Sequence, residues 1–191
     1  RRVLFRSTLA EELRQRGFRV VVGYQPPLSD EHDAGEVDLI CHLDGVVLLL
    51  EVKSGFIRST LHEVWLHRTN TLRKAARQLK RKQPVVLQAL LNDKGLRSDL
   101  LLSDFNPPPV LHAWVVDTSI EFDGEAVDGF HVISREVMEI ALRDEPHYLR
   151  EFEEMDEAEV GNEVETLYAD GFSAQALVRL IESDGVWCDL L

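Results

Sequence analysis

Two carboxylates and a lysine flank a short turn in the segment from residue 36 to 55, EVDLICHLDGVVLLLEVKSG. Asp38 precedes the turn, and Glu51 and Lys53 follow it at the end of an apolar run. Carboxylate oxygens are the ligands that Mg²⁺ and Mn²⁺ prefer, and a nearby ammonium group can stabilise a phosphate or orient an attacking water. This combination of residue types predicts metal-dependent hydrolysis of a phosphodiester bond.

The turn predicts how these side chains meet. Asp44-Gly45 between two apolar runs is typical of a two-residue hairpin, because a type I′ turn needs positive φ at both central positions. If the residues flanking this turn pair, Asp38 lies opposite Glu51 and Glu36 lies opposite Lys53. Opposed carboxylates in an apolar setting repel, and a bound divalent ion would relieve that repulsion. Period-two alternation then predicts that these four side chains share one sheet face with Ile40, His42, Val47 and Leu49.

The pattern resembles the PD-(D/E)XK nuclease superfamily, whose motif is an aspartate followed by Glu-x-Lys at the end of an apolar strand. Asp38, Glu51, Val52 and Lys53 match that motif one for one. Several branches, including RecB-like, Mrr-like and NERD (nuclease-related) domains, carry a glutamine on the next helix, and Gln78 in KAARQLKRK matches it. The resemblance therefore rests on five residues from two neighbouring elements.

The spacer also resembles NERD-type sequences, because Gly55 and Trp65 stand where those sequences have a glycine and a tryptophan. The resemblance covers roughly residues 8–116. It implies an α/β fold with a restriction-endonuclease-like αβββαβ core, a mixed sheet, Mg²⁺ or Mn²⁺ as cofactor, and DNA as substrate. The residues that it implies are catalytic Asp38, Glu51, Lys53 and Gln78, with Asp38, Glu51 and the Val52 carbonyl as metal ligands.

The first predicted helix lacks a glutamate at the position where related nucleases usually have one. Related nucleases usually supply another glutamate from this helix, and counting back from Gly17 places that position at Arg6. Glu12, which flanks the apolar stripe of the helix, is the alternative acid. Residues 1–7, RRVLFRS, match one reading frame of a sequencing-library adapter, so we expect an artefact there. Both a native glutamate at this position and a catalytically inactive, nuclease-like nucleic-acid-binding module therefore stay open.

A structural interpretation competes with the catalytic one. Glu-x-Lys at a strand end is often a solvated terminus with a weak ion pair, and Gln78 could be an ordinary exposed helix residue. The run VVLLLEV is nearly continuous in apolar residues, which is typical of a strand buried on both faces. Because the ends of buried strands commonly carry binding sites, we favour the catalytic interpretation.

Charge is segregated along the chain, whose formal net charge is −13. Residues 53–97 hold 11 Lys or Arg against 2 acids, whereas residues 98–191 hold 4 against 23. The basic block suits contact with the phosphates of a nucleic acid, with a solvated helix face as the alternative. An apolar stripe that includes Ala76 and Leu79 should turn the cations of this helix outward, and we expect the same of Lys82. The residues predicted to bind phosphate are Arg73, Lys74, Arg77, Lys80 and Arg81.

The 191 residues, 45% of them hydrophobic, suffice for one packed domain and an appendage. We expect a core over 8–134, with Pro84 breaking or kinking the basic helix, and an acidic helical appendage over 135–191 in which Ser173 caps a helix. The appendage could be a solvated face, a surface for a protein partner or self-association, or a cover for the basic helix. The sequence has no membrane-length apolar run, and its two cysteines suit a cytoplasmic protein.

Overall fold

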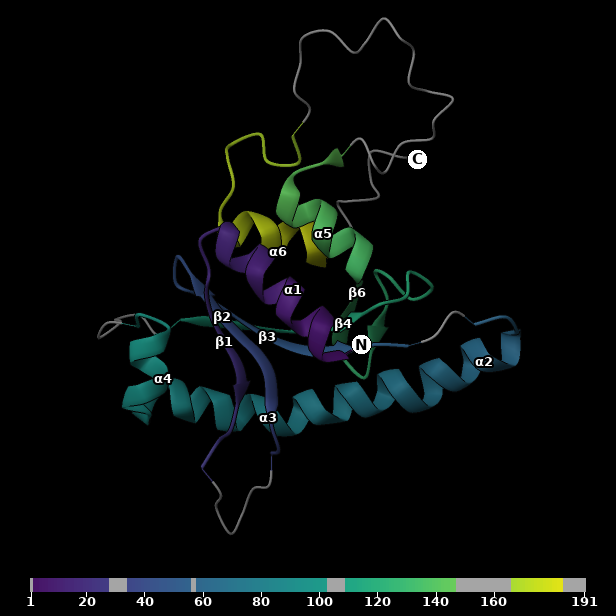
Figure 1. Cartoon of the computed structure of the whole chain (residues 1–191), viewed down its shortest axis with the longest axis horizontal. Coiled ribbons are helices and arrows are strands. Elements are labelled where there is room, and N and C mark those ends of the chain that lie inside the picture. The colour runs from purple at the N-terminus through teal and green to yellow at the C-terminus, as the bar shows by residue number, and fades with distance from the viewer. Residues whose placement is uncertain (1, 28–33, 56–57, 103–108, 147–165, 184–191) are drawn as a thin grey trace, which may run out of the picture.

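The computed structural model describes residues 2–27, 34–55, 58–102, 109–146 and 166–183. It has an α/β fold in which helices cover both faces of a six-stranded mixed sheet (Figure 1). The elements are α1 (Arg2–Gln15), β1 (Arg19–Tyr24), β2 (Val37–Leu43), β3 (Val46–Lys53), α2 (Leu61–Leu66), the π-helix η1 (His67–Leu72), α3 (Arg73–Asn92), α4 (Lys94–Asp99), β4 (Val110–Asp117), β5 (Ala126–Val127), β6 (Phe130–Ser134), α5 (Arg135–Arg143) and α6 (Ala174–Glu182).

The strand order is β1-β2-β3-β4-β6-β5, and the sheet changes direction in its middle. The pairs β1-β2 and β2-β3 are antiparallel, whereas β3-β4 and β4-β6 are parallel. Parallel neighbours need a long crossover, and the helices from α2 to α4 supply it between β3 and β4. The carboxyl ends of β3 and β4 therefore meet at one edge, where Lys53 pairs with Asp117.

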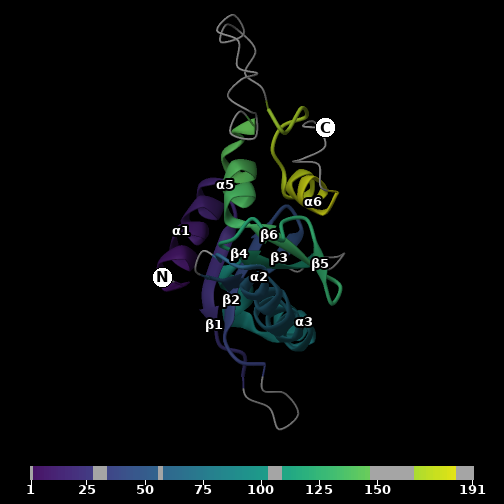
Figure 2. The ribbon, with the colours of Figure 1, turned by 90° about the vertical axis from the view of Figure 1, so that its right-hand side faces the viewer.

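Each sheet face has its own apolar core, which makes three layers (Figure 2). On one face, Leu9, Leu13 and other α1 residues pack with α5, α6 and the sheet. On the other face, Leu79 and its neighbours on α3 pack with α4 and the sheet. The strand β3 contributes side chains to both cores, and all of its residues before Lys53 are buried. This burial confirms the interpretation of its apolar run.

The helices after residue 134 belong to the first of these cores. Met138 of α5 and Leu177 of α6 lie in the same buried cluster as Leu9 of α1. Ser173 caps α6 as predicted, because its hydroxyl accepts the Ala176 N–H at 3.1 Å. Most of the acidic stretch expected in the appendage, residues 147–165, lies outside the described residues.

The predicted hairpin register is confirmed where the two strands pair. Leu43 pairs with Val46, and the pairing continues to Leu39 opposite Leu50. Both turn residues have positive φ, +50° for Asp44 and +76° for Gly45, as a type I′ turn requires.

Beyond that last pair, the prediction that eight side chains share one face is wrong. Leu39 packs in the α1 core, whereas Val37 packs in the α3 core with Ile40, so period-two alternation breaks between them. The break coincides with Asp38, whose carboxylate accepts the Val52 backbone N–H instead of facing α3. A side-chain acceptor has replaced a rung of the backbone ladder at this point.

Of the break or kink predicted at Pro84, the break is wrong, because α3 continues through the proline to Asn92. Pro84 is exposed, so the carbonyl that loses its intrahelical partner lies on the water side. Buried Leu79 and Val86 hold the helix to the sheet on both sides of the proline. Together α2, η1 and α3 form one continuous helical rod over residues 61–92, and none of the described helices is long and apolar enough to cross a membrane.

Cys41 provides a test of this core. It is fully buried in β2, and burial raises the pKa of its thiol well above the usual range. Because the thiolate is the reactive form, we expect the native Cys188→Ser variant to resist a thiol reagent at neutral pH and to react once denaturant unfolds it. Mass spectrometry after labelling measures this, and rapid modification of the native variant would contradict the packing of β2.

Candidate active site

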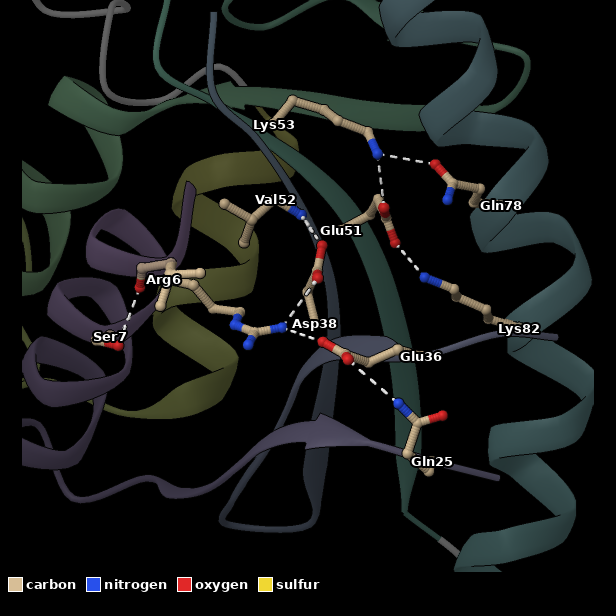
Figure 3. Close-up of polar contacts among 11 residues, drawn as sticks. Arg6, Ser7, Gln25, Glu36, Asp38, Glu51, Val52, Lys53, Gln78 and Lys82 are labelled. Atoms are coloured by element: carbon tan, nitrogen blue, oxygen red, sulfur yellow. Dashed lines mark hydrogen bonds and ion pairs between the residues drawn. The ribbon is translucent and has the colours of Figure 1, made fainter. Parts of the chain in front are cut away.

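Two buried carboxylates lie at the adjoining ends of β2 and β3 (Figure 3). Asp38 is 1% exposed and Glu51 is 0% exposed. Asp38 Oδ2 accepts the Val52 N–H at 2.9 Å, and Asp38 Oδ1 lies 3.4 Å from Arg6 Nη1. Burying a carboxylate is costly unless cations or N–H groups contact it, and both kinds of group are present here.

Glu51 lies in a chain of polar contacts that reaches from β3 to α3. Lys53 Nζ is 2.7 Å from Glu51 Oε1 and 2.8 Å from Gln78 Oε1. Lys82 Nζ is 2.5 Å from Glu51 Oε2. Gln78 and Lys82 lie one helical turn apart on the same face of α3. This face therefore contacts both Lys53 and Glu51 (Figure 3).

Lys82 departs from the outward orientation that the sequence predicts. It is only 2% exposed, and its ammonium group pairs with Glu51. Position 82 lies within the buried stripe of α3, three residues after Leu79 and four before Val86, so its long side chain runs inward toward a buried acid. The predicted phosphate-binding residues are all exposed on α3: Arg73, Lys74, Arg77, Lys80 and Arg81.

The Val52 carbonyl points toward the Asp38 side of β3. In a strand, the N–H and the C=O of one residue point to the same side, and the Val52 N–H already bonds to Asp38. The Lys53 carbonyl points the other way, because it accepts the Thr118 N–H at 3.2 Å. The three predicted metal ligands, the Asp38 and Glu51 carboxylates and the Val52 carbonyl, thus gather at one edge of the sheet.

Arg6 of α1 reaches this edge from the opposite layer. Its guanidinium group pairs with Glu36 and contacts Asp38, and Gln25 Nε2 donates to Glu36 Oε2 at 3.1 Å. The count from Gly17 places the expected glutamate of the first helix at position 6. That position lies beside Asp38, and an arginine occupies it. Glu12 instead pairs with Arg143 of α5, and the structure does not bring it to the group around Asp38.

Acids and cations balance in this cluster. The acids are Glu36, Asp38 and Glu51, and the cations are Arg6, Lys53 and Lys82. The carboxylate repulsion that the sequence predicts is therefore offset here by the protein's own cations, and it does not by itself require a divalent ion. Across the part of the chain that the structure describes, no group of three or more His, Cys, Asp or Glu is arranged to hold a metal ion.

The donor set still suits Mg²⁺ or Mn²⁺ in its chemistry. Two carboxylates and a main-chain carbonyl at one strand edge are hard oxygen donors, which these ions prefer. Arg6 beside Asp38 opposes the binding of a second positive charge at the same oxygens. The donor types fit the ion, whereas Arg6 beside Asp38 and the Lys53 and Lys82 ammonium groups on the two Glu51 oxygens disfavour it.

A second buried cluster borders Lys53, and sequence reasoning missed it. Asp117, the β4 partner of Lys53, is 0% exposed, and His67 Nε2 lies 2.5 Å from Asp117 Oδ2. Arg58 Nη2 approaches the same carboxylate to 3.8 Å, and Arg58 Nη1 donates to Ser119 Oγ at 2.8 Å. These contacts tie the segments that follow β3 and β4 to η1. Asp117 could have been predicted as a site residue, because it is an aspartate at the end of an apolar strand.

The chain matches no protein-family model and no curated protein sequence.

Proposed function

We propose that this chain is a metal-dependent nuclease with a restriction-endonuclease-like core, which hydrolyses the phosphodiester bonds of DNA. The observation that carries the proposal is the convergence of Asp38 with the Glu51-Val52-Lys53 run, together with the bond from Lys53 to Gln78. Four matches to a short motif could arise by chance in sequence. Their meeting at one end of two adjacent strands, with the glutamine helix beside them, is the arrangement that the chemistry needs.

The order of elements agrees with the proposed core. A helix, three antiparallel-paired strands, a helical crossover and a parallel strand follow one another from α1 to β4. The crossover presents the exposed cations of α3 on the outside and Gln78 on the inside. One helix can therefore contact the phosphates of a bound strand and fix the lysine at the site.

Each residue has a role in this proposal. Asp38, Glu51 and the Val52 carbonyl would hold Mg²⁺ or Mn²⁺, which supplies Lewis-acid polarisation of the scissile phosphoryl group. Lys53 donates to a phosphate oxygen or orients the attacking water, and Gln78 fixes the direction of its ammonium group. Lys82 pairs with the Glu51 carboxylate, which is 0% exposed, and offsets its negative charge.

Incubation of the purified chain with linear, circular and single-stranded DNA tests this function. We expect cleavage in Mg²⁺ or Mn²⁺ and none after chelation, because the ion carries the electrophilic role. Loss of circular DNA would indicate endonuclease action, and loss of linear DNA alone would indicate exonuclease action. Absence of metal-dependent cleavage in all three substrates would contradict the proposal.

The contact between Arg6 and Asp38 favours a second candidate function. A guanidinium group on a metal-ligating carboxylate disfavours the ion, whereas the exposed cations of α3 would still bind nucleic acid. This combination describes a nuclease-like module that binds DNA without cutting it. Substitution of Arg6 distinguishes the two functions.

We expect Arg6→Glu to strengthen Mn²⁺ binding by at least about tenfold, because it removes a competing cation and adds an oxygen donor beside Asp38. Isothermal titration measures the affinity, and Arg14→Glu, on the same helix, is the matched control. If Arg6→Glu binds Mn²⁺ no better than the parent chain, the cluster is not a metal site and the binding module gains support.

A further inference from the structure

The helical rod over residues 61–92 extends beyond the sheet at its amino-terminal end. The helix α2 has no buried residues, and Figure 1 shows it at the right-hand end of the rod, beyond the strands in that view. The rod begins with a capping box in which Glu63 accepts the Ser59 and Thr60 N–H groups at 2.8 and 3.1 Å. The capping box therefore stabilises the start of the helix locally, and although Val64 packs against the α3 core, the exposed end needs a further explanation.

An aromatic patch covers this end of the rod. Trp65 is 58% exposed, and the ring of His62 stacks on it with centroids 6.0 Å apart and an interplanar angle of 19°. Leu61, one turn before Trp65, is 89% exposed. An indole that buries so little surface adds little to stability, so folding alone does not explain it. The stacked imidazole holds the indole in one orientation, as a binding surface requires.

From residue 64 onward, the charged residues of the rod are all Lys or Arg. Residues 64–92 contain no Asp or Glu, and Glu63 directs its carboxylate back to the helix start. Exposed cations follow along the rod: Arg68, which pairs with Glu125 at 2.9 Å, and then Arg73, Lys74, Arg77, Lys80 and Arg81 of α3. A row of cations that begins at an exposed aromatic ring is complementary to a polyanion that also carries flat apolar rings.

We propose that Trp65 is a stacking platform for a base of single-stranded DNA whose phosphates follow the α3 cations to Lys53. A base inside a duplex offers only its edges, so an exposed indole can stack on an unpaired or terminal base. Trp65 lies about 20 Å along the helix from Gln78, at 1.5 Å per residue. That distance corresponds to about six stacked nucleotides at 3.4 Å each. The inference rests on the proposed function for its direction, and it names unpaired DNA as the preferred substrate.

Fluorescence anisotropy with a labelled oligonucleotide tests this platform. Binding is measured in chelator, so that no cleavage can occur, with a single strand of about 12 nucleotides and with a blunt hairpin duplex. We expect Trp65→Ala to weaken binding of the single strand by about 5- to 100-fold and to leave duplex binding unchanged, and Trp65→Phe to retain most of the affinity. Leu91→Ala, an exposed residue near the other end of the rod, is the matched control and should change neither affinity.

Three outcomes would overturn the inference: an unchanged affinity of Trp65→Ala for the single strand, an equal loss for both DNAs, or a Trp65-dependent change in oligomeric state without DNA. Cleavage by the parent chain is assayed separately in Mg²⁺. Trp65-dependent binding without cleavage would refute the nuclease and retain the platform. Cleavage with no contribution from Trp65 would refute the platform and retain the nuclease.

Discussion

Replacement of Lys82 by methionine is expected to destabilise the folded chain by about 3 kcal/mol. The substitution leaves an oxygen of Glu51, which is 0% exposed, without its 2.5 Å ammonium partner. Lys53 still bonds to the other oxygen, which keeps the loss at the lower end of the range for a broken buried ion pair. The free energy of unfolding in urea, compared with that of the parent chain, measures the effect.

Two further variants separate the ion pair from a general effect of losing a lysine. Lys80→Met, an exposed position on the same helix, should change stability by less than about 0.5 kcal/mol. The double variant Glu51→Leu with Lys82→Met should recover most of the loss, because an apolar pair can replace a buried ion pair at little cost. A loss below about 1 kcal/mol in Lys82→Met would show that Glu51 does not depend on this lysine.

Replacement of Lys53 by methionine is expected to slow DNA cleavage by about 100- to 1000-fold at saturating metal. Its ammonium group lies between Glu51 and Gln78, and it is the one cationic donor among Asp38, Glu51, Lys53 and Gln78. Because Lys53 is not a metal ligand, Mn²⁺ affinity should not fall. Single-turnover cleavage and Mn²⁺ titration on the same preparation measure the two effects.

Lys74→Met is the matched control for Lys53→Met. Lys74 is an exposed cation of α3, so its loss should weaken DNA binding modestly and leave the single-turnover rate at saturating protein unchanged. Lys53→Met that cleaves at the parent rate would remove the lysine from the mechanism. A parallel fall in Mn²⁺ affinity would indicate that Lys53 acts by organising Glu51.

The hairpin was predictable because its register depends on local chemistry. Asp44-Gly45 needs positive φ at two adjacent positions, which selects one turn type and therefore one set of partners. The same reasoning failed after Leu39, where the Asp38 side chain takes the Val52 N–H and turns Val37 to the other core. Periodicity cannot anticipate a side chain that replaces a backbone acceptor.

The long helix shows a second limit of periodicity. His67 and Leu72 are both buried but five residues apart, a spacing that an α-helix does not bring to one face and that the π-helix η1 accommodates. The spacing of Lys82 from Leu79 and Val86 places it in the buried stripe, but its ion pair could not be predicted, because that depends on the position of Glu51 in the sheet. The count from Gly17, which the resemblance to related nucleases supplied, pointed to Arg6, and that residue lies beside Asp38.

Cleavage of DNA by the parent chain and by Asp38→Asn, in Mg²⁺ and in chelator, tests the proposed chemistry most directly. Asparagine has the shape of aspartate and can still accept the Val52 N–H, so the variant should remain folded while losing a charged metal ligand. We expect metal-dependent cleavage by the parent chain and a loss of at least about 100-fold in Asp38→Asn. Equal cleavage by the two proteins, or none by the parent chain in Mg²⁺, would contradict a nuclease site at Asp38.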